Sequence, residues 1–140
     1  SVLDKISNIL GIINRKSELG FVNNSISKIN IKYTNENQNV DTLSGGNQQK
    51  VVFTRWIASD PLIYFLDEPT RGVDIGAKTE ILNLINNLAK DGLSVILMTS
   101  EMNDLLSLSD RIIVMAGGNI SKEFQRNTAT QEDIFKAAVV

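Results

Sequence analysis

The hydrophobic and polar positions divide the chain at about residue 43. Before it, apolar side chains recur at helical spacing, but Gly11 and Gly20 argue against one unbroken helix. The recurring positions are Leu3, Ile6, Ile9, Leu10, Ile12 and Ile13. Residues 30–42 are polar and rich in Asn and Gln, which predicts a loop.

After residue 43, patterns typical of helices and of strands alternate. The pattern predicts a helix over 45–58, an apolar strand over 62–67, a helix over 74–90 and a second apolar strand over 94–99. Asp74 is a plausible N-cap of its helix and Gly92 a plausible stop. A short helix over 101–106, a pair of strands around Gly117 and Gly118, and a helix over 130–139 complete the chain.

This alternation predicts an α/β fold with parallel strands joined by helical crossovers. Both strands are continuous apolar runs, so we expect each to be covered on both faces. The expected interior includes the strand residues Ile63, Phe65, Ile96 and Met98, the helix-face residues Ile81, Leu84, Ile85 and Leu88, and Trp56. A parallel α/β sheet normally has more than two strands. We therefore expect this chain to be the later part of a larger domain.

Composition narrows the possible functions. With 140 residues and 42% hydrophobic content, the chain has the size of one globular domain, and its net charge of −2 gives no general attraction to nucleic acid. It has no cysteine and no histidine, which excludes thiolate metal sites and imidazole general bases. No stretch approaches the ~20 apolar residues of a membrane span. The chain begins with Ser1 rather than Met, and we expect it to be a piece of a longer protein.

Ser44, Gly45 and Gly46 stand directly before a predicted helix. The first backbone N–H groups of a helix lack partners and carry partial positive charge. Glycines let a bulky anion approach, and a serine hydroxyl adds a donor, so the group could bind a phosphate. The alternative is that Ser44 caps the helix and the glycines form a turn.

Asp67 and Glu68 follow the first apolar strand, at the sheet edge where α/β proteins bind ligands. One carboxylate could hold Mg²⁺ through its water shell, and the other could orient or deprotonate a water. Alternatively, the two acids cap the next turn, which Pro69 enforces. Ser100 follows the second strand, where it could contact a ligand or cap a short helix.

Taken together, these segments resemble the ATPase domain of ABC transporters. LSGGNQQKV looks like the signature motif, LIYFLDEPT the Walker B strand, RGVD the D-loop and DRIIVMAGGNI the terminal strand pair. The match covers residues 43–124, and residues 1–42 fit the helical subdomain by position only. Three departures from the commonest spelling are similar to the second ATPase domain of the tandem ATPases that power ribose, galactose, arabinose and xylose importers: Asn47, Arg71-Gly72 and Ser100.

The resemblance implies a partial P-loop NTPase fold, an α/β domain with a parallel-sheet core. Residues 1–42 would be a remnant of the helical subdomain, and residues 43–140 would run from the signature helix through Walker B to the end of the domain. The phosphate-loop half is missing, since no G-x-x-x-x-G-K-[ST] occurs in the chain. We therefore expect the isolated chain to be inactive, and to bind neither ATP nor Mg²⁺ tightly.

The resemblance also implies roles for individual residues. Asp67 would hold Mg²⁺, Glu68 would be the general base, and Asp74 would couple two ATP sites. The γ-phosphate of ATP bound to the opposite domain would meet the signature residues Ser44, Gly45, Gly46 and Asn47, with Gln48 and Lys50 beside it. Ser100 occupies the switch-histidine position but supplies no positive charge. This implies an uneven pair of sites, in which Gly46→Asp impairs hydrolysis more than Glu68→Gln.

The partners implied are a second ABC ATPase domain (in the same chain or a homodimer), transmembrane permease subunits and, indirectly, a sugar-binding protein, but no nucleic acid. The protein would lie at the cytoplasmic face of the membrane. Two alternatives stay open within the family: a non-hydrolytic half that supports its partner, and an ABC ATPase of DNA repair or translation. An unrelated α/β domain is the third. The sequence does not identify the solute.

Overall fold

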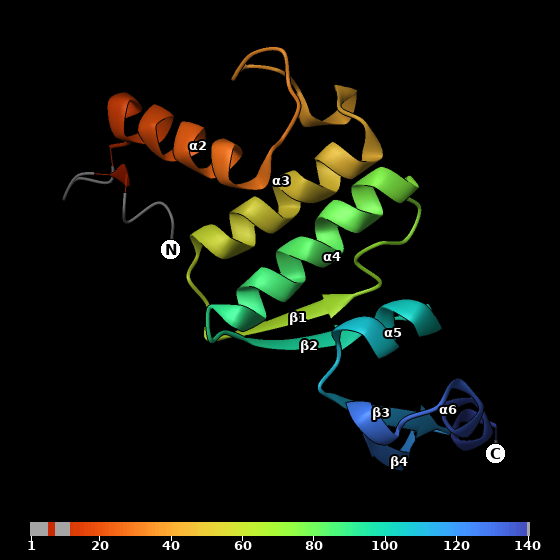
Figure 1. Cartoon of the computed structure of the whole chain (residues 1–140). Coiled ribbons are helices and arrows are strands. Elements are labelled where there is room, and N and C mark those ends of the chain that lie inside the picture. Colours follow the sequence, from red (N-terminus) through yellow and green to blue (C-terminus); the bar gives the residue numbers. More distant parts are fainter. Residues whose placement is uncertain (1–5, 8–11, 140) are drawn as a thin grey trace. The chain divides into compact units, whose positions relative to one another are not determined.

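A computed structural model describes residues 6, 7 and 12–139 (Figure 1). The chain forms two compact units: residues 1–64 with 70–94, and residues 65–69 with 95–140. These units do not follow the boundary at residue 42 that the sequence suggests, and the assignment of residues 1–42 to a helical subdomain stays a prediction. Of the apolar positions expected to lie on an early helix, Leu3, Ile9 and Leu10 fall outside the described residues.

Three helices make up most of the first unit: α2 (Arg15–Ile29), α3 (Gly45–Ala58) and α4 (Ile75–Lys90). Helix α3 packs against both α2 and α4 (Figure 1). Helix α2 begins where the Asn14 side chain accepts hydrogen bonds from the first-turn N–H groups, and it continues through Gly20. The loop after α2 contains a single 3₁₀ turn, Val40–Thr42.

The predicted bounds of α3 are confirmed, and those of α4 differ by one residue. Asp74 caps α4 as predicted, because its Oδ1 accepts the N–H of Ala77 at 2.9 Å. Gly92 follows the helix with φ +85°, a conformation that favours glycine. The expected core face of α4 is confirmed at Ile81, Ile85 and Leu88, which are buried, while Leu84 is half-buried.

Strands β1 (Ile63–Asp67) and β2 (Ser94–Met98) run parallel as neighbours in one sheet (Figure 1). The expectation that both faces are covered is wrong. Tyr64 and Leu66 are buried, but the side chains expected in the core are about half exposed: Ile63 48%, Phe65 55%, Ile96 45% and Met98 45%. Burial therefore alternates along β1, because only one face of this sheet is covered. Trp56, also expected inside, is 47% exposed.

Burial has a chemical consequence at Tyr64. It raises the pKa of the Tyr64 phenol above its ordinary value of 10.0, and the nearby Asp60 carboxylate raises this pKa further. Tyr64 is therefore a buried, neutral side chain of the strand that leads to Asp67.

The second unit contains helix α5 (Met102–Leu108), strands β3 (Arg111–Ala116) and β4 (Asn119–Gln125), and helix α6 (Gln131–Ala138). The strands form an antiparallel hairpin, whose turn at Gly117 and Gly118 has φ of +54° and +78°. Helix α6 packs against this hairpin. The core of the unit consists of Ile112, Val114, Phe124 and Ile134. Among the described residues, no helix is both long and apolar enough to cross a membrane.

Candidate functional site

The start of α3 is the first part of the candidate site. Ser44 is the N-cap residue, with extended backbone angles, but its side chain makes no capping hydrogen bond. The alternative in which the Ser44 hydroxyl caps the helix is therefore wrong. Ser44 and Gly45 are exposed, so the positive end of the helix dipole lies at the surface beside a serine whose hydroxyl does not cap the helix.

Asn47 holds the Ser44 side chain. Its Oδ1 accepts the backbone N–H of Lys32 at 2.9 Å, and its Nδ2 donates to the Ser44 Oγ at 2.8 Å. Lys32 lies fifteen positions earlier, in the loop after α2. The expectation that Asn47 contacts a phosphate stays a prediction, but both polar atoms of its side chain already have partners within the chain.

Gln48 and Lys50 have partners within the chain as well. The Gln48 Nε2 donates to the carbonyl oxygens of Leu43, at 2.9 Å, and Asp41, at 3.3 Å, which holds the chain that enters α3. Lys50 is only 4% exposed, and its Nζ donates to the Asn30 carbonyl at 3.0 Å and forms an ion pair with Glu80. Lys50 thus joins three helices, and its ammonium group is not available to flank a phosphate.

The two glycines of the signature differ in their surroundings. A Cβ at Gly45 would meet nothing within 4 Å, so an anion can approach there. A Cβ at Gly46 would overlap the Cβ of Ala77 on α4, and it would lie 3.8 Å from the Asp74 Oδ2. Gly46 is therefore needed for the close packing of α3 on α4, which places Asp74 beside the start of α3.

A second group of candidate residues, in the other compact unit, follows β1. Asp67 is exposed at the strand end, and Glu68 adopts a left-handed backbone with φ +45°. Its N–H donates to the Met98 carbonyl at 2.8 Å, and its Oε1 accepts the backbone N–H of Ser100 at 2.8 Å. The structure thus brings Glu68 and Ser100 together through a backbone N–H rather than the Ser100 hydroxyl. Glu101, not Ser100, is the N-cap residue of α5.

These acidic residues fit a magnesium ion only in part. Among the described residues, no group of three or more Asp or Glu side chains could hold a metal ion. A single carboxylate at the sheet edge is compatible with Mg²⁺, which keeps several waters and takes further ligands from nucleotide phosphates. The signature residues belong to one compact unit, and Asp67, Glu68 and Ser100 belong to the other.

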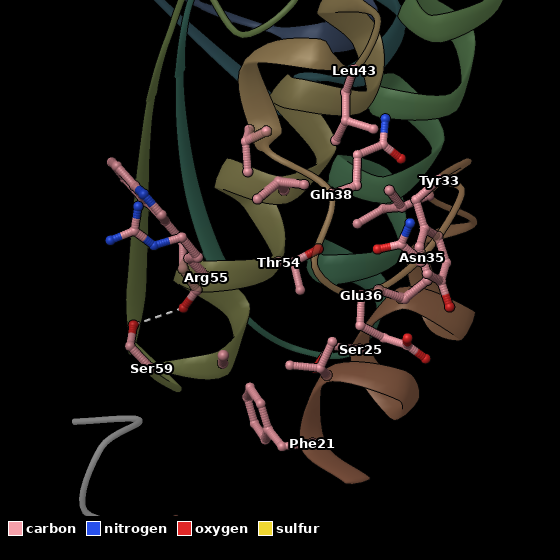
Figure 2. A pocket seen from close by; sticks show the side chains of 17 residues that line it. Phe21, Ser25, Tyr33, Asn35, Glu36, Gln38, Leu43, Thr54, Arg55 and Ser59 are labelled. Atoms are coloured by element: carbon pink, nitrogen blue, oxygen red, sulfur yellow. Dashed lines mark hydrogen bonds between the residues drawn. The ribbon is translucent and has the colours of Figure 1, made fainter. Parts of the chain in front are cut away.

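A cavity of about 800 Å³ lies beside α3 in the first unit. Figure 2 shows side chains from α2, the following loop and α3 around it, including Phe21, Tyr33 and Thr54. Its lining contains none of the predicted catalytic or phosphate-binding residues. The sequence patterns predicted neither this cavity nor the hydrogen bond between Lys32 and Asn47. Both depend on how the loop after α2 folds back onto α3.

Comparison with protein-family models gives a match to "ABC transporter" over residues 4–71. A dimeric ATP-binding cassette, solved in a post-hydrolysis state bound to ADP and Pi, superposes with a TM-score of 0.71, at 25% identity over 82% of this chain and 50% of that one. The structure of an inward-facing, metal-chelate type ABC transporter superposes with a TM-score of 0.77 and covers 99% of this chain and 58% of that one; at 20% identity it shows the fold alone.

The chain belongs to the ABC transporter family. Among its relatives, the ribose import ATP-binding protein RbsA of Caldanaerobacter subterraneus is 48% identical over 99% of this chain. The galactose/methyl galactoside import ATP-binding protein MglA of Clostridium tetani is 44% identical over 97% of it. The chain spans 28% and 27% of the lengths of these two proteins.

Membership of the ABC family confirms the expected fold class, an α/β ABC ATPase domain present in part. The family match begins at residue 4, so it includes most of the stretch before residue 43 in which no motif was evident. The motifs that indicated the family lie after that stretch. Helix α2 has no short motif of its own, and only comparison along its whole length relates it to the family.

Proposed function

We propose that this chain is part of the ATP-binding subunit of an importer for sugars or similar small polar solutes. Relatives named for ribose and galactose import support the solute class. The observation that carries the proposal is the exposed start of α3, where the Ser44 side chain leaves the helix uncapped. A helix start in this state can receive an anion held by another domain.

In this proposal, the start of α3 binds the γ-phosphate of an ATP that is anchored on the opposite domain. The Ser44 hydroxyl and the Gly45 N–H donate hydrogen bonds to the phosphate, and the helix dipole adds favourable electrostatics. Asp74, which lies beside Gly46, couples this contact to the second ATP site. These donors stabilise charge that develops on the phosphate during hydrolysis.

Glu68 acts at a different nucleotide from Ser44. It orients or deprotonates the attacking water at the nucleotide that this domain itself binds. Asp67 would hold Mg²⁺ through water, and the ion would supply charge neutralisation to the phosphates. Ser100 can contribute a backbone N–H to Glu68 and a hydroxyl, but no positive charge. We therefore propose that the Glu68 site is slow or silent, and that the site completed by Ser44 is the competent one.

The proposed partners follow from this arrangement. A second ABC ATPase domain presents the nucleotide, permease subunits receive the movement, and a sugar-binding protein delivers the solute to them. The subunit would work at the cytoplasmic face of the membrane without spanning it. The 140 residues alone contain no phosphate loop, so we propose that the isolated chain neither binds MgATP tightly nor hydrolyses it.

Transport-coupled ATPase activity of a full-length protein carrying this chain tests the proposal. Removing a hydrogen bond to a charged group typically costs about 1.5–3 kcal/mol, so Ser44→Ala should lower activity roughly 10- to 150-fold. Glu68→Gln should lower it much less. Gly46→Asp is a poorer probe, since its side chain would overlap Ala77.

The outcomes separate the candidate functions. If Ser44→Ala has no effect, the start of α3 does not contact the phosphate. If both variants abolish activity equally, the two sites are not uneven. If Glu68→Gln has no effect at all, the Glu68 site is silent rather than slow. This is the second candidate, in which this half supports its partner without hydrolysing ATP, and the absence of a positive charge at Ser100 is the observation behind it.

A further inference from the structure

We propose that Asn47 is a positioning residue, which fixes the Ser44 hydroxyl as a hydrogen-bond donor toward the phosphate. This inference rests on the proposed function, because it concerns the same contact at the start of α3. It assigns to Asn47 an action through Ser44, instead of a direct contact with the nucleotide. The link starts in a different part of the chain, at the backbone of Lys32.

The first step is the orientation of the Asn47 carboxamide. A backbone N–H can only donate a hydrogen bond, so the atom of Asn47 that faces the Lys32 N–H must be its oxygen. The Asn47 NH₂ group must then face Ser44, and it donates to the Ser44 Oγ at 2.8 Å. The Lys32 backbone thereby settles which end of the carboxamide Ser44 meets.

The second step is the direction of the Ser44 hydroxyl. A serine hydroxyl has one proton to donate and two lone pairs to accept. Because the Ser44 Oγ accepts from Asn47, its own proton has to point elsewhere. Within the described part of the chain this proton has no acceptor, and Ser44 is exposed. A phosphate oxygen at the start of α3 would be a suitable acceptor for it.

The third step is the anchoring of Lys32. Asn30 ends α2 in a left-handed conformation with φ +53°, and Ile31 is buried. One turn beyond Asn47, the buried Lys50 Nζ donates to the Asn30 carbonyl at 3.0 Å. Two side chains of α3, at positions 47 and 50, therefore hold the segment 30–32 against the helix, so the N–H that orients Asn47 has a fixed place.

A double-mutant cycle in a full-length protein carrying this chain tests the inference, with kcat/KM for ATP measured in Ser44→Ala, Asn47→Ala and the double variant. Loss of one neutral hydrogen bond corresponds to about fivefold, so Asn47→Ala should lower kcat/KM by about that factor. In the Ser44→Ala background the same change should have no further effect, since Asn47 acts through Ser44. Additive losses would overturn the inference and indicate a direct contact between Asn47 and the nucleotide.

Gln38→Ala is a matched control. The Gln38 carboxamide makes the same pair of contacts in the neighbouring loop, accepting the Thr34 N–H at 2.7 Å and donating to the Thr42 hydroxyl at 3.0 Å. Its removal should leave kcat/KM unchanged. A loss equal to that of Asn47→Ala would mean that loop stability, and not the orientation of Ser44, determines activity, which would contradict the inference.

Asn47→Asp keeps the test decisive if Asn47→Ala does not fold. The aspartate retains the acceptor for Lys32 but replaces the donor to Ser44 with an acceptor, so the Ser44 proton would turn toward residue 47. We expect kcat/KM to fall at least as far as in Asn47→Ala. Unchanged activity would overturn the inference. Unchanged activity in Ser44→Ala would instead remove the proposed function itself.

Discussion

At the scale of single residues, the two glycines at the start of α3 illustrate how neighbours in sequence meet different constraints. Gly45 faces open space, whereas a Cβ at Gly46 would overlap Ala77 of α4. A motif of two glycines suggests one shared reason for both, namely room for an anion. The structure supplies that reason for Gly45 and a packing reason for Gly46.

Alanine at each glycine separates these two reasons. Gly46→Ala should destabilise the protein by about 1–3 kcal/mol, because overpacking would push α3 and α4 apart. Gly45→Ala, at an open position, should change the free energy of unfolding by about 0.5 kcal/mol or less. Urea unfolding of both variants of the full-length protein measures the difference. Equal midpoints would show that α3 and α4 do not meet closely at Gly46.

The sequence patterns select the candidate residues, whose roles stay predictions, but they do not specify most of the contacts that these residues make. The Ser44–Asn47 bond spans three positions, and a local pattern could have suggested it. The Lys32 partner of Asn47 and the Asn30 and Glu80 partners of Lys50 lie at least fifteen positions away. Spacing does not specify such pairs, and so Lys50 was expected beside a phosphate although its ammonium group is buried.

At the scale of elements, one buried charge ties α2, α3 and α4 together. Lys50 extends from α3 to the carbonyl that ends α2 and to a carboxylate on α4. Lys50→Met would keep much of the volume, but would leave Asn30 and Glu80 without this partner. Since an unpaired polar group costs about 1–3 kcal/mol, we expect the unfolding free energy to fall by that amount.

Lys136→Met is the control for this prediction. Lys136 also pairs with a glutamate, Glu132, at 2.6 Å, but both side chains are more than two-thirds exposed. An exposed pair contributes little, so its loss should change the unfolding free energy by less than about 0.5 kcal/mol. Denaturant midpoints for the two variants provide the comparison. If Lys50→Met were as harmless as the control, Lys50 would not link the three helices.

Element positions were the most predictable part of the fold. Helices α3 and α4 were located to within a residue because their signals are local: an apolar period in each and, for α4, a capping Asp74 and a stop at Gly92 beside the helix. Strands β1 and β2 were also located, but their burial was wrong. An apolar run shows that a strand is fit to be covered on both faces, whereas actual coverage depends on which other segments are present.

At the scale of the whole molecule, the uncovered face of the β1–β2 sheet is the largest departure from expectation. Its apolar residues Ile63, Phe65, Ile96 and Met98 are about half exposed. The chain spans less than a third of the length of the relatives compared with it. We therefore predict that, in a full-length protein, further chain covers this face, in agreement with the apolar character of both strands.

Phe65→Asp tests that coverage. In a full-length protein the carboxylate would be buried without a partner, so we expect a loss of several kcal/mol in stability and little folded protein. In the 140-residue chain expressed alone, the same carboxylate would face water, and we expect solubility to rise. Phe65→Leu, which keeps an apolar side chain, should be tolerated in both. If the full-length protein accepts Phe65→Asp with an unchanged melting temperature, this face is open to solvent there too, and the apolar runs of β1 and β2 then require another explanation.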